Sequence, residues 1–258
     1  MRFFFFCIVW ALDSKLERAK MKKTMQKMAV GLVVVLALSG YANEKQKFQP
    51  DSYYENKNLQ ELESLCENND FKACHRAGVK HTDRIQSVKL FEKSCNGGYG
   101  KGCIGLAGAY ETGEGVEQNT QKAIALYNKT IEFGENNGHY WLGRLYKEGK
   151  RVKQDYTKAF EYFQQGCEQE NNASCFEVGV AYYRGDGVRQ DFMKSKEICE
   201  NLCEKDDAIG CAMLGIQYQN GHGVRQDFTK AKEIYGKACD LGNQSGCDYY
   251  KKLQQKGY

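Results

Sequence analysis

Apolar residues recur along the chain at the spacing of helices that bury one face. In one such segment they stand at i, i+3, i+4 and i+7 and so share one side of a helix: Cys103, Leu106, Ala107 and Tyr110. Gly113 and Gly115 follow, and glycine readily adopts the left-handed conformation that ends a helix and turns the chain. The pattern predicts a first helix, a glycine turn and a second helix.

This unit repeats every 36 residues. The segment that begins at Ala173 recurs in similar form 36 positions later, and the same frame extends back to Lys101 and forward to the C-terminus. One position of the frame is always tyrosine, one valine, one lysine and one small: Tyr110, Tyr146, Tyr182 and Tyr218; Val116, Val152, Val188 and Val224; Lys122, Lys158, Lys194 and Lys230; Ala123, Ala159, Ser195 and Ala231. A fixed period of this length is typical of a solenoid, in which each helix pair buries its apolar face against the next pair.

Polar residues of the frame fit the start of the second helix. Asp155, Asp191 and Asp227 stand just before it, where a carboxylate caps free backbone amides. Upstream, the frame predicts a second helix over residues 52–66 and a first helix over residues 72–81. The unit between Cys66 and Cys95 is only 29 residues long, because the glycine turn is missing there. We therefore expect about twelve helices in six pairs.

Twelve cysteines change this picture by adding covalent constraints. Ten of them form five pairs separated by eight positions: Cys66 and Cys74, Cys95 and Cys103, Cys167 and Cys175, Cys203 and Cys211, Cys239 and Cys247. In the frame, one member ends a helix and the other opens the next, within reach of a disulfide. Each small loop contributes roughly 2.5 kcal/mol on the chain-entropy model. Metal binding is disfavoured, because no Cys-x-x-Cys occurs and the four histidines lack ligand spacing.

The cysteine pattern departs from the period at two places. Where another pair is expected the chain has Ile131 and His139, so one turn between helices lacks its disulfide. Cys199 is left over, and the corresponding residues of the other repeats are aromatic: Tyr127, Phe163 and Tyr235. We interpret Cys199 as a buried free thiol that fills an apolar slot, in preference to a reactive nucleophile.

Residues 1–42 have the composition of an export leader. Met21-Lys22-Lys23 precedes an apolar stretch from Ala29 to Leu38 and small residues that end at Ala42, which predicts a secretory signal cleaved after Ala42. A further apolar run, residues 3–12, leaves two alternatives: translation starts at Met21, which we favour, or the leader is double. A short segment, residues 43–51, then leads to the repeats at residues 52–258. The expected location is secreted or periplasmic, with no membrane span in the mature chain.

The leader also carries the apparent basic charge. It contains seven of the 37 Lys and Arg residues but two of the 33 Asp and Glu residues, so the remainder has one more acidic than basic residue. Such a balance gives no electrostatic basis for nucleic-acid binding.

The frame resembles a known repeat. Leu214-Gly215-x-x-Tyr218-x-x-Gly221-x-Gly223-Val224-x-x-Asp227-x-x-Lys230-Ala231 is similar to the Sel1-like repeat, and the paired cysteines behind a signal are similar to the Helicobacter cysteine-rich proteins. The resemblance covers residues 52–258. It implies a right-handed α-solenoid of about six Sel1/TPR-like repeats and, as members are described, penicillin (β-lactam) binding or weak β-lactamase activity.

The residues themselves do not support hydrolysis. A serine β-lactamase needs Ser-x-x-Lys, and neither this motif nor Ser-Asp-Asn nor Lys-Thr-Gly occurs. A zinc enzyme needs clustered histidines, which the sequence also lacks. No cofactor or metal is expected.

The other class of function is a binding scaffold, since the first helices of a solenoid expose long surfaces. Aromatic and basic residues that vary between repeats are our candidates for this surface: Tyr140, Trp141, Arg144, Lys147, Phe176 and Tyr183. The alternative is that most of them pack between neighbouring pairs. The expected partner of a monomer is a protein or a cell-wall-like or β-lactam small molecule, with a weak β-lactamase as the alternative function.

Overall fold

The computed structural model describes residues 49–258. The predicted leader, its start at Met21 and its cleavage after Ala42 lie outside the described residues, as does Cys7. The described residues form thirteen α-helices and no strand. The chain divides into two units, Met1–Lys57 and Asn58–Tyr258. In the first unit the described part contains one helix, α3 (Asp51–Glu55).

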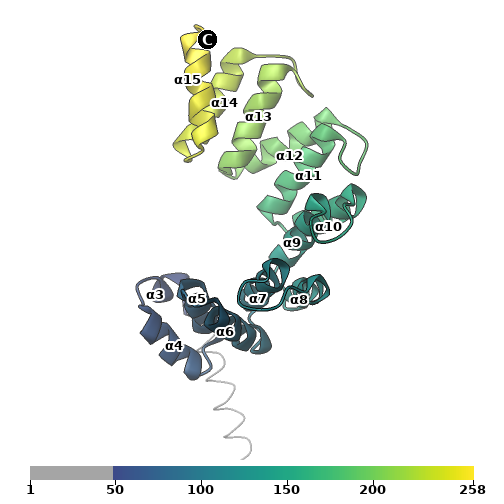
Figure 1. Cartoon of the computed structure of the whole chain (residues 1–258). Helices are drawn as coiled ribbons and strands as arrows, with labels where there is room; N and C mark the ends of the chain where they lie inside the picture. The colour runs from purple at the N-terminus through teal and green to yellow at the C-terminus, as the bar shows by residue number, and fades with distance from the viewer. Residues whose placement is uncertain (1–48) are drawn as a thin grey trace, which may run out of the picture. The chain divides into compact units, whose positions relative to one another are not determined.

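The second unit is an all-α solenoid of twelve helices, each of which packs against the next one along the chain (Figure 1). These helices are α4 (Leu59–Glu67), α5 (Phe71–Lys80), α6 (Arg84–Asn96), α7 (Gly100–Thr112), α8 (Thr120–Glu132), α9 (Asn137–Glu148), α10 (Tyr156–Glu168), α11 (Asn172–Arg184), α12 (Phe192–Glu204), α13 (Ala208–Asn220), α14 (Phe228–Asp240) and α15 (Gln244–Gln255). The first helices of the repeats are the odd-numbered ones from α5 onward.

One predicted helix is divided. The frame predicts a single helix over residues 52–66, but the chain forms α3 and then starts α4 at Leu59. Asn58 begins α4 with a reciprocal cap: its side chain accepts from the Glu61 amide at 2.9 Å, and its own amide donates to the Glu61 carboxylate at 2.8 Å. Such a capping box favours a helix start over continuation.

Glycines and aspartates end and start the helices as the frame predicts. The first helices of four repeats end at a left-handed glycine: Gly113, Gly149, Gly185 and Gly221. The side chains of Asp155, Asp191 and Asp227 accept hydrogen bonds from amides in the first turn of the following helix. These contacts satisfy amides that have no partner within the helix.

A second glycine brings each turn against the preceding repeat. Gly115 has a φ of 75°, and a Cβ there would collide with the backbone carbonyl of Arg84 at the start of α6. Gly187 and Gly223 contact the starts of α10 and α12 in the same way. The turn between α9 and α10 has Arg151 at this position, and it does not adopt a positive φ.

Five disulfides link consecutive helices, each between cysteines eight residues apart. The Cα atoms of each pair are 4.4–4.6 Å apart. Between α8 and α9 this bridge is absent, and the two helices contact each other less extensively than any other consecutive pair of the second unit. His139 occupies the cysteine position and is buried there, which lowers the pKa of its imidazole.

A sixth disulfide should form if cysteines are placed at this gap. We expect the double variant Ile131→Cys/His139→Cys to oxidise spontaneously and to gain about 2.5 kcal/mol in free energy of unfolding, because the bridge closes a loop of the same length as the other five. Urea unfolding of the oxidised and reduced forms measures this gain. The single variants are the controls. An oxidised double variant no more stable than these singles would contradict the prediction.

Candidate functional site

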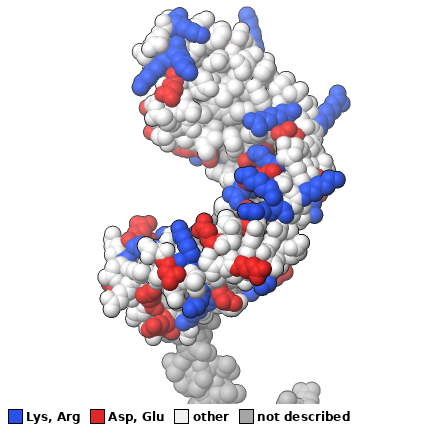
Figure 2. Space-filling model, in the orientation of Figure 1, with Lys and Arg blue, Asp and Glu red and all other residues white. Residues whose placement is uncertain are grey.

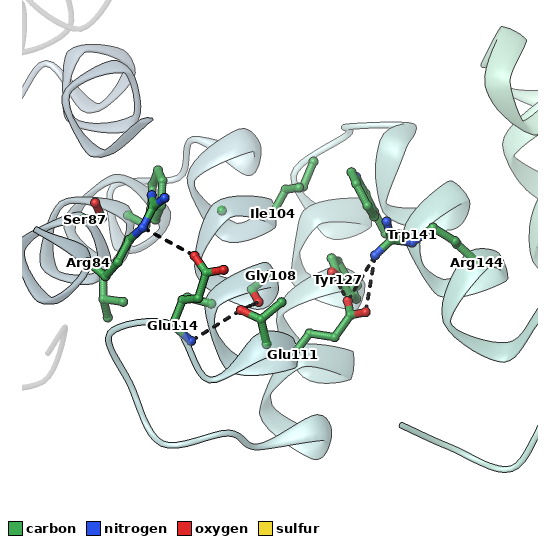
Figure 3. Close-up of a pocket in the computed structure, with 14 residues that line it drawn as sticks. Arg84, Ser87, Ile104, Gly108, Glu111, Glu114, Tyr127, Trp141 and Arg144 are labelled. Carbon is green, nitrogen blue, oxygen red and sulfur yellow. Dashed lines mark hydrogen bonds and ion pairs between the residues drawn. The ribbon is translucent and has the colours of Figure 1, made fainter. Parts of the chain in front are cut away.

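Two adjoining hollows run along α7. One has a volume of about 300 Å³ and lies between α6, α7 and α9; the other has about 420 Å³ and lies toward the N-terminus of α7. They share four lining residues: Phe91, Ile104, Gly105 and Trp141. We call these two hollows together the α7 groove. Figure 3 shows the first hollow, with Arg84 and Ser87 on one side and Trp141 and Arg144 on the other.

Missing side chains on α7 create the first hollow. The frame places Gly105 and Gly108 where α9 has Trp141 and Arg144 and where α13 has Met213 and Ile216. A Cβ on Gly105 would meet the ring of Phe91, whereas a Cβ on Gly108 would meet nothing within 4 Å. Gly108 therefore exposes the helix backbone to open space at the floor of the groove.

Trp141 forms the opposite wall and is held on both sides. Its ring stacks on that of Tyr127 with the centroids 6.2 Å apart and the planes within 6° of parallel. The guanidinium carbon of Arg144 lies 4.2 Å from the Trp141 ring centroid, a cation–π contact. Together these contacts fix the indole in one orientation beside the hollow.

Glu111 joins Tyr127 and Arg144 at the base of this wall. The Tyr127 hydroxyl donates to its carboxylate at 2.8 Å, and the Arg144 guanidinium donates to it at 3.3 Å. Burial and the neighbouring Glu111 charge raise the pKa of Tyr127 well above its usual value, so its phenol stays protonated. Tyr127 therefore acts as a hydrogen-bond donor that positions Glu111.

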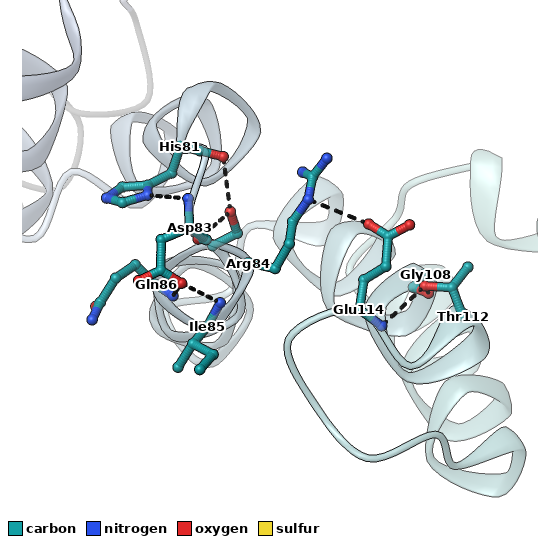
Figure 4. A network of polar contacts seen from close by, with 9 residues as sticks. His81, Asp83, Arg84, Ile85, Gln86, Gly108, Thr112 and Glu114 are labelled. Carbon is teal, nitrogen blue, oxygen red and sulfur yellow. Dashed lines mark hydrogen bonds and ion pairs between the residues drawn. The ribbon is translucent and has the colours of Figure 1, made fainter.

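The other wall is fixed by the turn that leads out of α7. Arg84 forms an ion pair with Glu114 at 3.4 Å, and both side chains are largely exposed. Figure 4 shows that the Glu114 amide donates to the Thr112 hydroxyl, which in turn donates to the Gly108 carbonyl at 3.0 Å. Asp83 caps α6 by accepting from the Ile85 amide at 2.8 Å, which fixes the start of the helix that carries Arg84.

The six predicted surface residues do not all lie together. Tyr140, Trp141 and Arg144 line the α7 groove, although each is partly buried. Lys147, Phe176 and Tyr183 lie outside it. Sequence reasoning missed Phe91, Glu111 and the two glycines. The repeat frame could have revealed the two glycines, because they stand on α7 where α9 has the large residues Trp141 and Arg144.

The hydrogen bond to Glu111 depends on one buried position of the repeat frame, which we call the buried slot. Tyr127 and Tyr235 occupy equivalent buried positions, and each hydroxyl donates to the residue sixteen positions upstream: Glu111 in one case and Gln219, at 3.3 Å, in the other. In the two repeats between them the slot has no hydroxyl, and the upstream residue contacts the next repeat. Glu111 does both, since Arg144 belongs to the next repeat. Lys147 pairs with Glu177 at 2.5 Å, and the Tyr183 hydroxyl lies 2.8 Å from Nδ1 of His222.

The free thiol of Cys199 is not placed to act as a nucleophile. Cys199 is buried without a disulfide partner, and burial raises the pKa of its thiol to about 12. Within residues 49–258 no group of three or more His, Cys, Asp or Glu side chains is arranged to hold a metal ion.

The two tyrosines of the buried slot should contribute unequally to the free energy of unfolding. We expect Tyr127→Phe to lower the free energy of unfolding by about 1.5–3 kcal/mol, because its acceptor is a carboxylate, and Tyr235→Phe by about 0.5–1.5 kcal/mol, because its acceptor is a neutral amide. Urea unfolding followed by circular dichroism measures both. Equal losses in the two variants would show that the Glu111 charge adds nothing.

Cys199 should not react in the folded protein. At pH 8 the native thiol is protonated and shielded, so we expect no labelling by a thiol reagent, whereas a urea-unfolded chain of residues 43–258 should expose one reactive thiol. A spectrophotometric thiol count measures both states. A count above one after unfolding would contradict the five disulfides.

Comparison with known proteins identifies the repeat. The model of the Sel1 repeat matches residues 73–99, 100–132, 137–171, 172–207 and 208–243. A protective antigen of uropathogenic Escherichia coli with an SLR fold is 27% identical to this chain, with a TM-score of 0.65. The match covers 78% of this chain and 45% of that protein, so this chain spans less than half of the antigen's length. A Sel1 repeat protein of Oxalobacter formigenes is 22% identical with a TM-score of 0.66, over 86% of this chain and 88% of that one.

Another solved structure, cysteine-rich protein B of Helicobacter pylori, is 28% identical with a TM-score of 0.41, over 52% of this chain and 96% of that one. No curated protein sequence matches the chain. Five matched repeats, which together span more than half of the sequence, show that this chain belongs to the Sel1 repeat family.

Proposed function

We propose that the chain is an exported interaction scaffold that binds a protein partner in the α7 groove. Export is supported by the five disulfides, which are typical of oxidising compartments outside the cytoplasm, and by the leader predicted at residues 1–42. No helix in the described part of the chain is both long and apolar enough to cross a membrane.

One observation carries the binding proposal: two hollows meet at a tryptophan that is already held in place. Trp141 is stacked on Tyr127 and covered by Arg144, so it would lose little conformational freedom when a partner contacts it. Tryptophan and arginine are among the residues most enriched at the energetic anchors of protein interfaces. Preorganised anchors beside a hollow suit recognition of a side chain that projects from a partner.

Penicillin binding, which the Helicobacter cysteine-rich resemblance implies, has less support from the residues. Catalysis of β-lactam opening would need an activated nucleophile. The Cys199 thiol is buried and protonated, the Tyr127 phenol is protonated, and the Thr112 hydroxyl donates to a backbone carbonyl. We therefore place recognition of a protein segment ahead of β-lactam binding and hydrolysis, and we expect a monomeric scaffold.

Selection of peptides on the purified, oxidised mature protein tests the proposal. We expect a phage-displayed library of random 12-residue peptides to yield sequences whose affinity falls at least tenfold in Trp141→Ala, because truncating a central aromatic anchor removes about 2 kcal/mol of binding energy.

Tyr183→Ala is the matched control, since this tyrosine lies on α11 outside the groove; it should leave peptide affinity unchanged. Circular dichroism must show both variants folded. Labelling with a fluorescent penicillin forms the second arm. Penicillin binding that is lost in Trp141→Ala, together with no enriched peptide, would replace the protein partner by a β-lactam-like ligand.

A further inference from the structure

We infer that the α7 groove recognises an extended segment of the partner that carries an aromatic side chain and, a few residues away, a carboxylate. This inference rests on the proposed function and names the chemistry of the ligand. The aromatic group would enter the first hollow, over Gly108, and the carboxylate would lie in the second hollow, beside Lys101.

The first hollow has the shape and charge for a neutral aromatic group. Its volume of about 300 Å³ stands where two side chains of the repeat are missing, between the rings of Phe91 and Trp141. The charged groups on its lining pair with each other, Arg84 with Glu114 and Arg144 with Glu111. A charged occupant would have to break one of these pairs, whereas an aromatic ring adds ring–ring contacts without doing so.

The second hollow has a basic residue on its lining. Lys101 is the one Lys, Arg, Asp or Glu residue on its lining, and His75, Asn137 and Tyr140 supply further polar groups. Its walls are otherwise apolar or aromatic. On the face shown in Figure 2, acidic and basic side chains are interspersed over the N-terminal helices of the second unit. The inferred selectivity for a carboxylate rests on Lys101.

The spacing of the two hollows sets the spacing in the ligand. Gly108 and Lys101 are seven residues apart on α7, which corresponds to about 10.5 Å along the helix axis at 1.5 Å per residue. An extended chain covers this distance in about three residues at 3.3 Å each. The expected motif is therefore an aromatic residue with Asp or Glu two to four positions away.

Variants of Gly108 separate occupation of the hollow from damage to the fold. Gly108→Ala removes a helix-interior glycine and should fold like the wild type, because its Cβ meets no neighbour, and it should weaken peptide binding less than a large side chain does. Gly108→Trp fills the hollow from within and should weaken binding at least tenfold. Both variants should match the wild type in helix content by circular dichroism. If Gly108→Trp does not fold, Gly108→Leu replaces it.

Lys101→Glu tests the carboxylate. We expect it to weaken the selected peptides at least tenfold, and to have less than threefold effect on the same peptides with the acidic residue replaced by alanine. Enrichment of an aromatic–acidic spacing supports the inference.

Three results would overturn it: enriched peptides that bind Gly108→Trp as tightly as wild type, peptides insensitive to Lys101→Glu, or a consensus with basic residues at this spacing. Peptides lost in Trp141→Ala but retained in Gly108→Trp and Lys101→Glu would leave the proposed function standing and remove the inference alone. A selection without any enriched sequence would overturn both.

Discussion

Each helix pair has an apolar face that only the next pair can bury, and this dependence determines the order of the whole second unit. In four successive repeats, the buried slot between consecutive helices is filled by Tyr127, Phe163, Cys199 and Tyr235. Where the slot holds a tyrosine, its hydroxyl donates to the residue sixteen positions upstream, Glu111 or Gln219. Where it holds Phe163 or Cys199, the upstream residue has no such donor and contacts the next repeat. The residue in the slot thereby determines whether the upstream side chain is bonded within its own repeat.

The groove follows from the same dependence. A solenoid surface is continuous when each first helix presents large side chains to its neighbours. On α7 two successive positions of that surface are glycine, and the neighbouring helices do not move in to fill the space, because disulfides and close glycine turns hold α6 and the turn after α7 in place. The hollow is thus a property of the stack that no single helix possesses.

Much of this architecture could be predicted from the sequence because its determinants are local. A glycine at a helix end, an aspartate at the next helix start and two cysteines eight residues apart each act within one turn. The broken first helix was also locally encoded, since Asn58 and Glu61 form a capping box, but the continuous apolar pattern concealed it. The groove was not predicted because Gly105, Gly108, Phe91 and Trp141 belong to three helices whose adjacency only the fold establishes.

The repeat that carries Trp141 and Arg144 is also the least constrained one. The turn before α9 lacks a disulfide, and the turn after it has Arg151 in place of the second glycine. What holds α9 to the preceding repeat on the groove side is noncovalent: the stacking of Trp141 on Tyr127 and the ion pair from Arg144 to Glu111. The side chains proposed to contact a partner are therefore the same ones that fix α9. A ligand that packs on Trp141 would restrain this junction further, so binding energy and local stability are coupled at one place in the chain.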